Sequence, residues 1–119
     1  ARMTQAHLEG AKLTRALARQ ANLAQAVLAK ADLEQANFQD ADFRQADLRA
    51  ANLVNGGFVH ANFTGVDMSR AGAFNADFLT ANFHDARLAN VDLRNARLEG
   101  ANLVCANIDN ATVGPVPPG

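Results

Sequence analysis

The 119-residue chain is poor in cysteine, in polar aromatic residues and in long apolar runs. It has one cysteine, Cys105, and neither tryptophan nor tyrosine. A single cysteine excludes an internal disulfide and a cysteine-based zinc site, and it favours a reducing compartment, so we expect a cytoplasmic protein. No apolar run approaches the roughly 18 residues of a membrane-spanning helix, and the first ten residues lack the layout of a signal peptide.

The chain also has little net charge of either sign. Its 11 basic and 12 acidic residues leave a formal net charge of −1. This balance selects neither a polyanion nor an anionic membrane, so we expect no direct nucleic-acid partner and no membrane partner. The length suits one domain, and a hydrophobic content of 49% is enough for a packed core.

A strict five-residue period runs through the chain. Residues 31–55 read ADLEQ ANFQD ADFRQ ADLRA ANLVN, and the phase holds without a slip from Ala1 to Pro115, which gives 23 units. We number the positions of each unit from 1 to 5. Position 1 is Ala in 20 units, position 2 is Asp or Asn in 13, and position 3 is Leu in 11 and Phe in six.

The placement of charge indicates which positions face inward. All 23 charged side chains lie at positions 2, 4 or 5, and none at positions 1 or 3. Burying an unpaired charge is costly, so positions 1 and 3 form the interior. Residues two apart share a side in an extended segment, whereas a five-residue period on a helix spreads around its whole circumference. The period therefore predicts short extended pieces and corners that stack into a solenoid, with little helix despite the abundant Ala and Leu.

The A(D/N)LXX run resembles the pentapeptide-repeat family over nearly the whole chain. The resemblance implies an all-β fold, a right-handed quadrilateral parallel β-helix of about six coils with four units per coil. We expect this solenoid over residues 1–114, followed by a Pro-rich C-terminal tail over residues 115–119. Pro115, Pro117 and Pro118 lack amide donors and should end the coil. The N-terminal edge has no such device, so we expect capping by upstream residues or end-to-end homo-association.

A coil of four units brings most of the phenylalanines together. Six of the seven fall in two core ladders on adjoining walls: Phe38, Phe58 and Phe78 on one, and Phe43, Phe63 and Phe83 on the other. Each buried ring is worth roughly 1.5–3 kcal/mol of apolar transfer free energy. These ladders should anchor the middle coils.

Few residues suggest a chemical site. His7, His60 and His84 fall on three different walls of the expected rod, and His84 beside Asp85 is too small a pair to define a metal site. We interpret the histidines and Cys105 as surface residues, and expect no catalytic, cofactor-binding or metal site, since a convex rod gives little convergence. The Asp and Asn residues at position 2 are interpreted as turn residues whose side chains hydrogen-bond the backbone.

The breaks in the outward pattern are more informative. Position 4 is apolar in four neighbouring units, at Val54, Val59, Phe74 and Leu79. We take these four side chains as a hypothetical protein-interaction surface. The small residues Gly56, Gly57 and Gly72 interrupt the repeat pattern beside it. The alternative is that Phe74 turns inward to fill the space left by Ala73, as Leu17 would beside Ala18. In that case only modest aliphatic groups remain outside.

These observations favour a non-enzymatic protein-interaction or structural scaffold module, or the repeat segment of a larger protein, whose partner is another protein. The resemblance implies an alternative, a DNA-mimicking regulator or protector of DNA gyrase, which needs an acidic face. The outward charges sum to 0, 0, 0 and −1 on the four expected walls. Arginines interrupt every acidic column, and they include Arg44, Arg49, Arg70, Arg87, Arg94 and Arg97. Such a surface imitates polyphosphate poorly.

Overall fold

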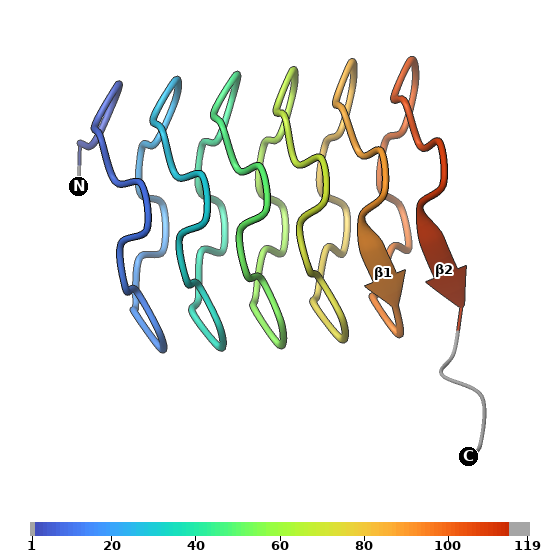
Figure 1. Ribbon diagram of the computed structural model, residues 1–119, viewed down its shortest axis with the longest axis horizontal. Coiled ribbons are helices and arrows are strands. Elements are labelled where there is room, and N and C mark those ends of the chain that lie inside the picture. The colour runs from blue at the N-terminus through green and yellow to red at the C-terminus, as the bar shows by residue number, and fades with distance from the viewer. Residues whose placement is uncertain (1, 115–119) are drawn as a thin grey trace.

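The computed structural model describes residues 2–114 of the chain (Figure 1). Residue 1 and residues 115–119 lie outside the described part. The expected C-terminal tail, and the expected stop at Pro115, Pro117 and Pro118, fall in that region and stay predictions.

The chain winds as a solenoid of stacked coils that run from the N-terminal to the C-terminal end (Figure 1). Every bridge is parallel and joins residues 20 apart, from Arg2 with Asn22 to Arg87 with Asn107. Within residues 2–114, the bridges lengthen into named strands only at β1 (Asp92–Arg94) and β2 (Thr112–Gly114), which pair in parallel. The predicted all-β, right-handed quadrilateral parallel β-helix is confirmed.

Each coil contains four units, because every bridge joins a unit to the fourth unit after it, and units joined in this way stack into a wall. Residues 21–25 belong to wall 1, and the next three units, 26–30, 31–35 and 36–40, belong to walls 2, 3 and 4 in turn. Each wall also contains the units stacked above and below. Both named strands belong to wall 3. A residue and its bridge partner therefore sit on the same wall, one coil apart.

Each unit turns a corner at position 5. From Gln5 to Asn110, every residue at this position has a left-handed backbone with φ between 54° and 69°, and most of them are not glycine. The turn is closed because the N–H of the next position 1 donates to the carbonyl of position 3, as from Ala46 to Phe43 at 3.0 Å. The N–H groups of positions 2, 3 and 5 donate to neighbouring coils, which holds the corners in place.

In 13 units the remaining N–H, at position 4, is satisfied by a side chain. All 13 Asp and Asn residues at position 2 accept a hydrogen bond through Oδ1 from the N–H two residues later, at 3.0–3.1 Å. We call this bond the Asx cap. It supports the interpretation of these residues as turn residues. Units with another residue at position 2 lack the cap.

Positions 1 and 3 fill the interior from Ala21 to Leu93, and no polar or charged side chain among the described residues is buried with them. The rings of Phe38, Phe58 and Phe78 stack with centroids 5.8 and 5.3 Å apart. Those of the second column, Phe43, Phe63 and Phe83, stack at 4.9 Å in both steps. Rings of the two columns also meet edge to face, so the ladders form one aromatic core.

Candidate binding surface

The four outward apolar side chains lie on two adjoining walls and form what we call the apolar patch: Val54 and Phe74 on wall 3, Val59 and Leu79 on wall 4. All four are half-buried, and none belongs to the hydrophobic core or packs against it. The Phe74 ring lies beside the guanidinium of Arg94, whose Cζ is 5.7 Å from the ring centroid. This is a cation–π distance, so the ring packs on the outer surface beneath a charged group.

The inward alternative for Phe74 does not match this arrangement. Ala73 is fully buried, yet the neighbouring ring stays outside the core. The parallel drawn from Leu17 is wrong, because Leu17 is 86% exposed even though Ala18 is small. In an extended segment the side chains alternate between two sides, so a small residue at position 3 does not turn its neighbour inward.

Two of the patch residues belong to capped units. The N–H of Val54 donates to Asn52 Oδ1, and the N–H of Leu79 donates to Asp77 Oδ1, each at 3.0 Å. The backbone of these two units therefore offers no free N–H at position 4. Their contribution to a contact is the aliphatic side chain alone.

The other two patch residues, Val59 and Phe74, lie two residues after a glycine. Gly57 and Gly72 occupy position 2 and provide no cap, and within residues 2–114 the N–H groups of Val59 and Phe74 have no hydrogen-bond partner. A Cβ at Gly72 would meet no atom within 4 Å, so the space beside the Phe74 amide is open. The patch thus joins apolar side chains to two unpaired backbone donors. The sequence signal for this, a missing Asp or Asn at position 2, was present but was read only as a small break.

Gly56, the third break, has a different role. It occupies an interior position, where a Cβ would lie 2.5 Å from Cε2 of Phe58 and 3.1 Å from the Leu53 carbonyl oxygen. Its lack of a side chain makes room for the central ring of one phenylalanine ladder. Gly56 therefore belongs to the packing of the core rather than to the patch.

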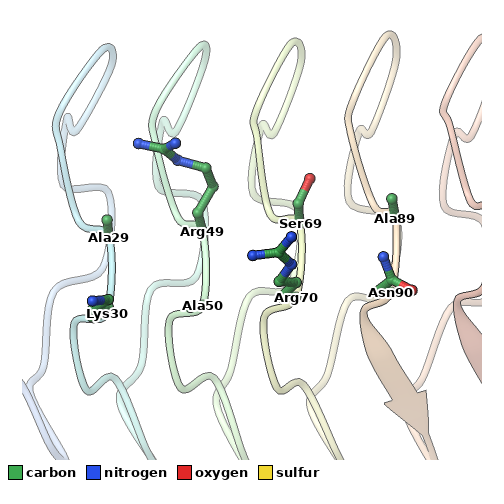
Figure 2. Close-up of a pocket in the computed structure, with 8 residues that line it drawn as sticks. All are labelled: Ala29, Lys30, Arg49, Ala50, Ser69, Arg70, Ala89 and Asn90. Carbon is green, nitrogen blue, oxygen red and sulfur yellow. The ribbon is translucent and has the colours of Figure 1, made fainter.

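A second feature of the surface, which we call the basic hollow, was missed by the sequence reasoning. It is a depression of about 520 Å³ formed by positions 4 and 5 of wall 2 on four successive coils (Figure 2). Its lining combines small side chains with three cationic ones. The lining residues are Ala29, Lys30, Arg49, Ala50, Ser69, Arg70, Ala89 and Asn90. The net charge of wall 2 does not reveal this cluster, because the acidic residues of the same wall cancel its positive charge in the sum.

Part of the remaining surface charge is paired within units. Arg44, Arg49 and Arg94 bind the carboxylate two residues earlier, with N–O distances of 2.7, 2.7 and 2.9 Å. These hydrogen bonds hold the pKa values of Asp42, Asp47 and Asp92 below the ordinary aspartate value. An arginine beside each of these three acids interrupts the acidic columns of walls 1, 2 and 3.

The histidines and the cysteine lie apart. His7, His60 and His84 are on walls 2, 4 and 1, and Cys105 is exposed. His60 Nδ1 contacts the Thr80 hydroxyl. Among residues 2–114, no three His, Cys, Asp or Glu side chains gather as metal ligands, and there is no helix of the length and hydropathy needed to span a membrane.

A five-residue repeat with an inward apolar pair, a left-handed corner and a side-chain cap defines a β-solenoid. The family model for pentapeptide repeats matches residues 1–40, 41–78 and 81–113. The chain therefore belongs to the pentapeptide-repeat family.

Several solved structures share the fold. A pentapeptide repeat protein from the Arabidopsis thaliana thylakoid lumen is 28% identical with a TM-score of 0.76, over 78% of this chain and 65% of that one. HetL, a pentapeptide repeat protein involved in heterocyst differentiation regulation from the cyanobacterium Nostoc sp. strain PCC 7120, is 30% identical with a TM-score of 0.58, over 93% of this chain and 63% of that one.

A third structure, trypsin-treated QnrB1, a plasmid-mediated fluoroquinolone resistance protein, is 14% identical with a TM-score of 0.56, over 86% of this chain and 64% of that one. At this identity the likeness concerns the fold alone. The chain spans less than two thirds of the length of these three structures. No curated protein sequence matched the chain.

Proposed function

We propose that the rod is a non-enzymatic module that binds another protein on its outer walls, with the apolar patch as the centre of the contact. One observation carries this proposal: Phe74 and Val59 each combine an outward apolar side chain with a backbone N–H that is unpaired within the described residues. The two residues lie on adjoining walls. A partner segment can pack against the apolar side chains and accept hydrogen bonds from the unpaired backbone N–H groups. A cytoplasmic location remains part of the proposal.

The chemistry of the patch describes the partner. Interfaces are enriched in aromatic residues and arginine, and a few central anchors carry most of the binding free energy. Phe74 under Arg94 supplies both residue types in one place. The unpaired N–H groups of Val59 and Phe74 would be satisfied by carbonyl or carboxylate oxygens. We therefore expect a partner that presents an apolar side chain next to exposed acceptor oxygens.

The test uses the Val59→Ser/Leu79→Ser double variant as bait, beside the wild type and a control on wall 1, Ala24→Ser/Thr64→Ser. A protein captured from the source organism is purified and titrated against all three by calorimetry. The patch variant should bind at least about tenfold more weakly, since two aliphatic contacts are lost. The control should match the wild type, and equal affinities for all three would contradict the proposal.

A separate variant, Phe74→Ser, distinguishes an anchor from a structural residue. Because the ring lies outside the core, its melting midpoint should stay close to that of the wild type while partner binding falls. A large drop in the midpoint would assign Phe74 to the stability of the rod.

Regulation or protection of DNA gyrase is the competing outcome. The pairing of Asp42, Asp47 and Asp92 with arginines argues against mimicry of a polyphosphate chain. A gyrase supercoiling assay separates the two functions. Inhibition by the purified rod, or protection of the enzyme from a quinolone, would replace the scaffold proposal.

A further inference from the structure

We infer that the basic hollow is a docking site for an acidic, extended segment of a partner protein, whose carboxylates lie between Lys30 and Arg70. This inference rests on the proposed function in one respect, that the occupant is a protein. It concerns a different surface, on wall 2, from the apolar patch on walls 3 and 4.

The first support is the state of the three cations. Arg49 binds the Asp47 carboxylate through Nε at 2.8 Å and Nη2 at 2.7 Å. Lys30 and Arg70 form no ion pair within residues 2–114. The two stand at position 5 of one column, so the carboxylates of a partner can pair with both without displacing an ion pair of the rod.

The second support is the space between the two cations. Lys30 and Arg70 occupy position 5 of wall 2 two coils apart, which is about 9.6 Å at ~4.8 Å between coils. Ala50 holds the position midway, and Figure 2 shows it between them, where its side chain is only a methyl group. An anion over Ala50 is therefore within reach of both long side chains. A larger residue at position 50 would fill the place where the anion sits.

The third support comes from the backbone at both ends of the hollow. Val27 and Arg87 stand at position 2, where neither can form an Asx cap, and the N–H groups of Ala29 and Ala89 have no hydrogen-bond partner within residues 2–114. In the 13 capped units a carboxylate or amide oxygen sits on this same N–H. An acceptor oxygen of a partner can occupy the same place on these two uncapped amides.

The spacing of these donors favours a chain over a compact anion. Ala29 and Ala89 are three coils apart, about 14 Å, and Arg49 and Arg70 lie on the two coils between them. A single phosphate or carboxylate reaches only part of such a row. An extended peptide rises ~3.3 Å per residue, so about four or five residues cover its length.

The acids around the hollow favour a peptide over a nucleic acid. Asp47 and Asp67 occupy position 2 of the same wall, and Asp67 accepts a hydrogen bond from the Ser69 hydroxyl at 2.7 Å. A continuous row of phosphates would lie close to both carboxylates. A peptide whose acidic residues are spaced by neutral ones meets the cations and leaves neutral groups beside the acids.

The probe is a fluorescein-labelled peptide of alternating Glu and Ala, with a peptide of alternating Gln and Ala as its neutral counterpart. Fluorescence anisotropy at low salt compares the wild type with Lys30→Gln/Arg70→Gln. The control variant, Lys12→Gln/Arg19→Gln, removes two cations that are also exposed and without an ion pair in the described residues, but lie outside the hollow. Both variants change the net charge equally, so a general electrostatic attraction affects them alike.

We expect the hollow variant to bind the acidic peptide about tenfold more weakly, because two exposed charge contacts are lost, and the control to bind within about twofold of the wild type. The neutral peptide should not bind. Equal losses in the two variants, or no binding of the acidic peptide to the wild type, would overturn the inference. The inference would also be overturned if a single-stranded oligonucleotide of equal charge bound the wild type more tightly than the acidic peptide and this binding depended on Lys30 and Arg70.

The Val59→Ser/Leu79→Ser variant keeps the two outcomes separate. It should bind the acidic peptide like the wild type, since the apolar patch lies on other walls. If the patch test fails and the peptide still binds through Lys30 and Arg70, only the proposed role of the patch is lost. Melting curves of all variants confirm that each is folded.

Discussion

The middle coils and the end coils contain the same kinds of residue at the same positions, yet they differ in burial. From residue 21 to residue 93 every position 3 is buried. In the last coil, Leu103, Ile108 and Val113 occupy position 3 but are 38%, 54% and 63% exposed. A large apolar residue at position 3 therefore becomes core only when coils lie on both sides, as expected of a solenoid whose repeats contact only their neighbours.

The backbone shows the same difference. In the middle coils the N–H of position 3 donates to the following coil, as from Phe58 to Asp77 at 2.7 Å. Within residues 2–114, the N–H groups of Leu103 and Ile108 have no such acceptor. At the other end, the N–H groups of His7, Lys12 and Leu17, at position 2 of the first coil, likewise have no acceptor among the described residues. The expected capping or end-to-end association concerns this first coil and stays a prediction.

The largest effect should come from removing a ring of the central ladder. Phe58 contacts Phe38, Phe43, Phe63 and Phe78, so Phe58→Ala leaves a cavity and should cost about 3–5 kcal/mol of unfolding free energy. Leu103→Ala, at position 3 of the last coil, should cost less than about 1 kcal/mol because its site is partly solvated. Urea denaturation measures both. Similar costs would mean that the end coils are as well packed as the middle.

A glycine pair gives a smaller effect. Gly56→Ala puts a methyl group against the Phe58 ring, which is held by its stacking neighbours, and should destabilise the rod by about 1–3 kcal/mol. Gly72→Ala meets open space, so it should be neutral or stabilise by about 0.4–1 kcal/mol through the unfolded chain. Thermal melting of the two variants checks the difference. A neutral Gly56→Ala would show that the ladder shifts easily.

The repeat made the fold predictable, because its period, its charge-free positions and its Asp and Asn residues all indicate the same corner. Position alone also located the phenylalanine columns and the turn role of position 2, but it left open whether Phe74 points outward or inward. Pattern could not distinguish Gly56 from Gly72, since one faces a packed ring and the other open space. That difference depends on where the Phe58 ring lies, which only the packed coils determine.

The basic hollow escaped prediction for a related reason. Charges were summed over whole walls, where Asp47 and Asp67 cancel Arg49 and Arg70. The relevant quantity is which cations find a carboxylate at their own corner, and this requires side-chain geometry. A sequence signal did exist in the small residues at positions 29, 50, 69 and 89, which leave room beside the cations.

The smallest effect on stability should come from the ion pairs of the walls and their dependence on pH. These pairs lie between residues 42 and 99. Within the described residues the first two coils have only a His7–Glu9 contact. The pKa values of Asp42 and Asp47 are lowered in the folded rod, chiefly by hydrogen bonds from Arg44 and Arg49. Depressed folded-state values mean that the stabilisation is present above the unfolded aspartate pKa of about 3.9 and is lost as the pH falls through the lower folded pKa.

An Asp42→Asn/Asp47→Asn variant tests this pH dependence without removing the Asx caps, because an asparagine oxygen accepts the same hydrogen bond, as Asn52 does at 3.0 Å. Its melting midpoint should be slightly below that of the wild type at pH 7, and the two should converge as the pH falls through the lowered pKa of the wild-type aspartates and these become protonated. Added salt should narrow the gap at pH 7, since the pairs are exposed and screened. The matched control, Asp32→Asn, changes a capping aspartate that forms no ion pair within residues 2–114, so it should follow the wild type at both pH values. A gap between the double variant and the wild type that persists at low pH would mean that the difference in stability does not come from the charges of these aspartates.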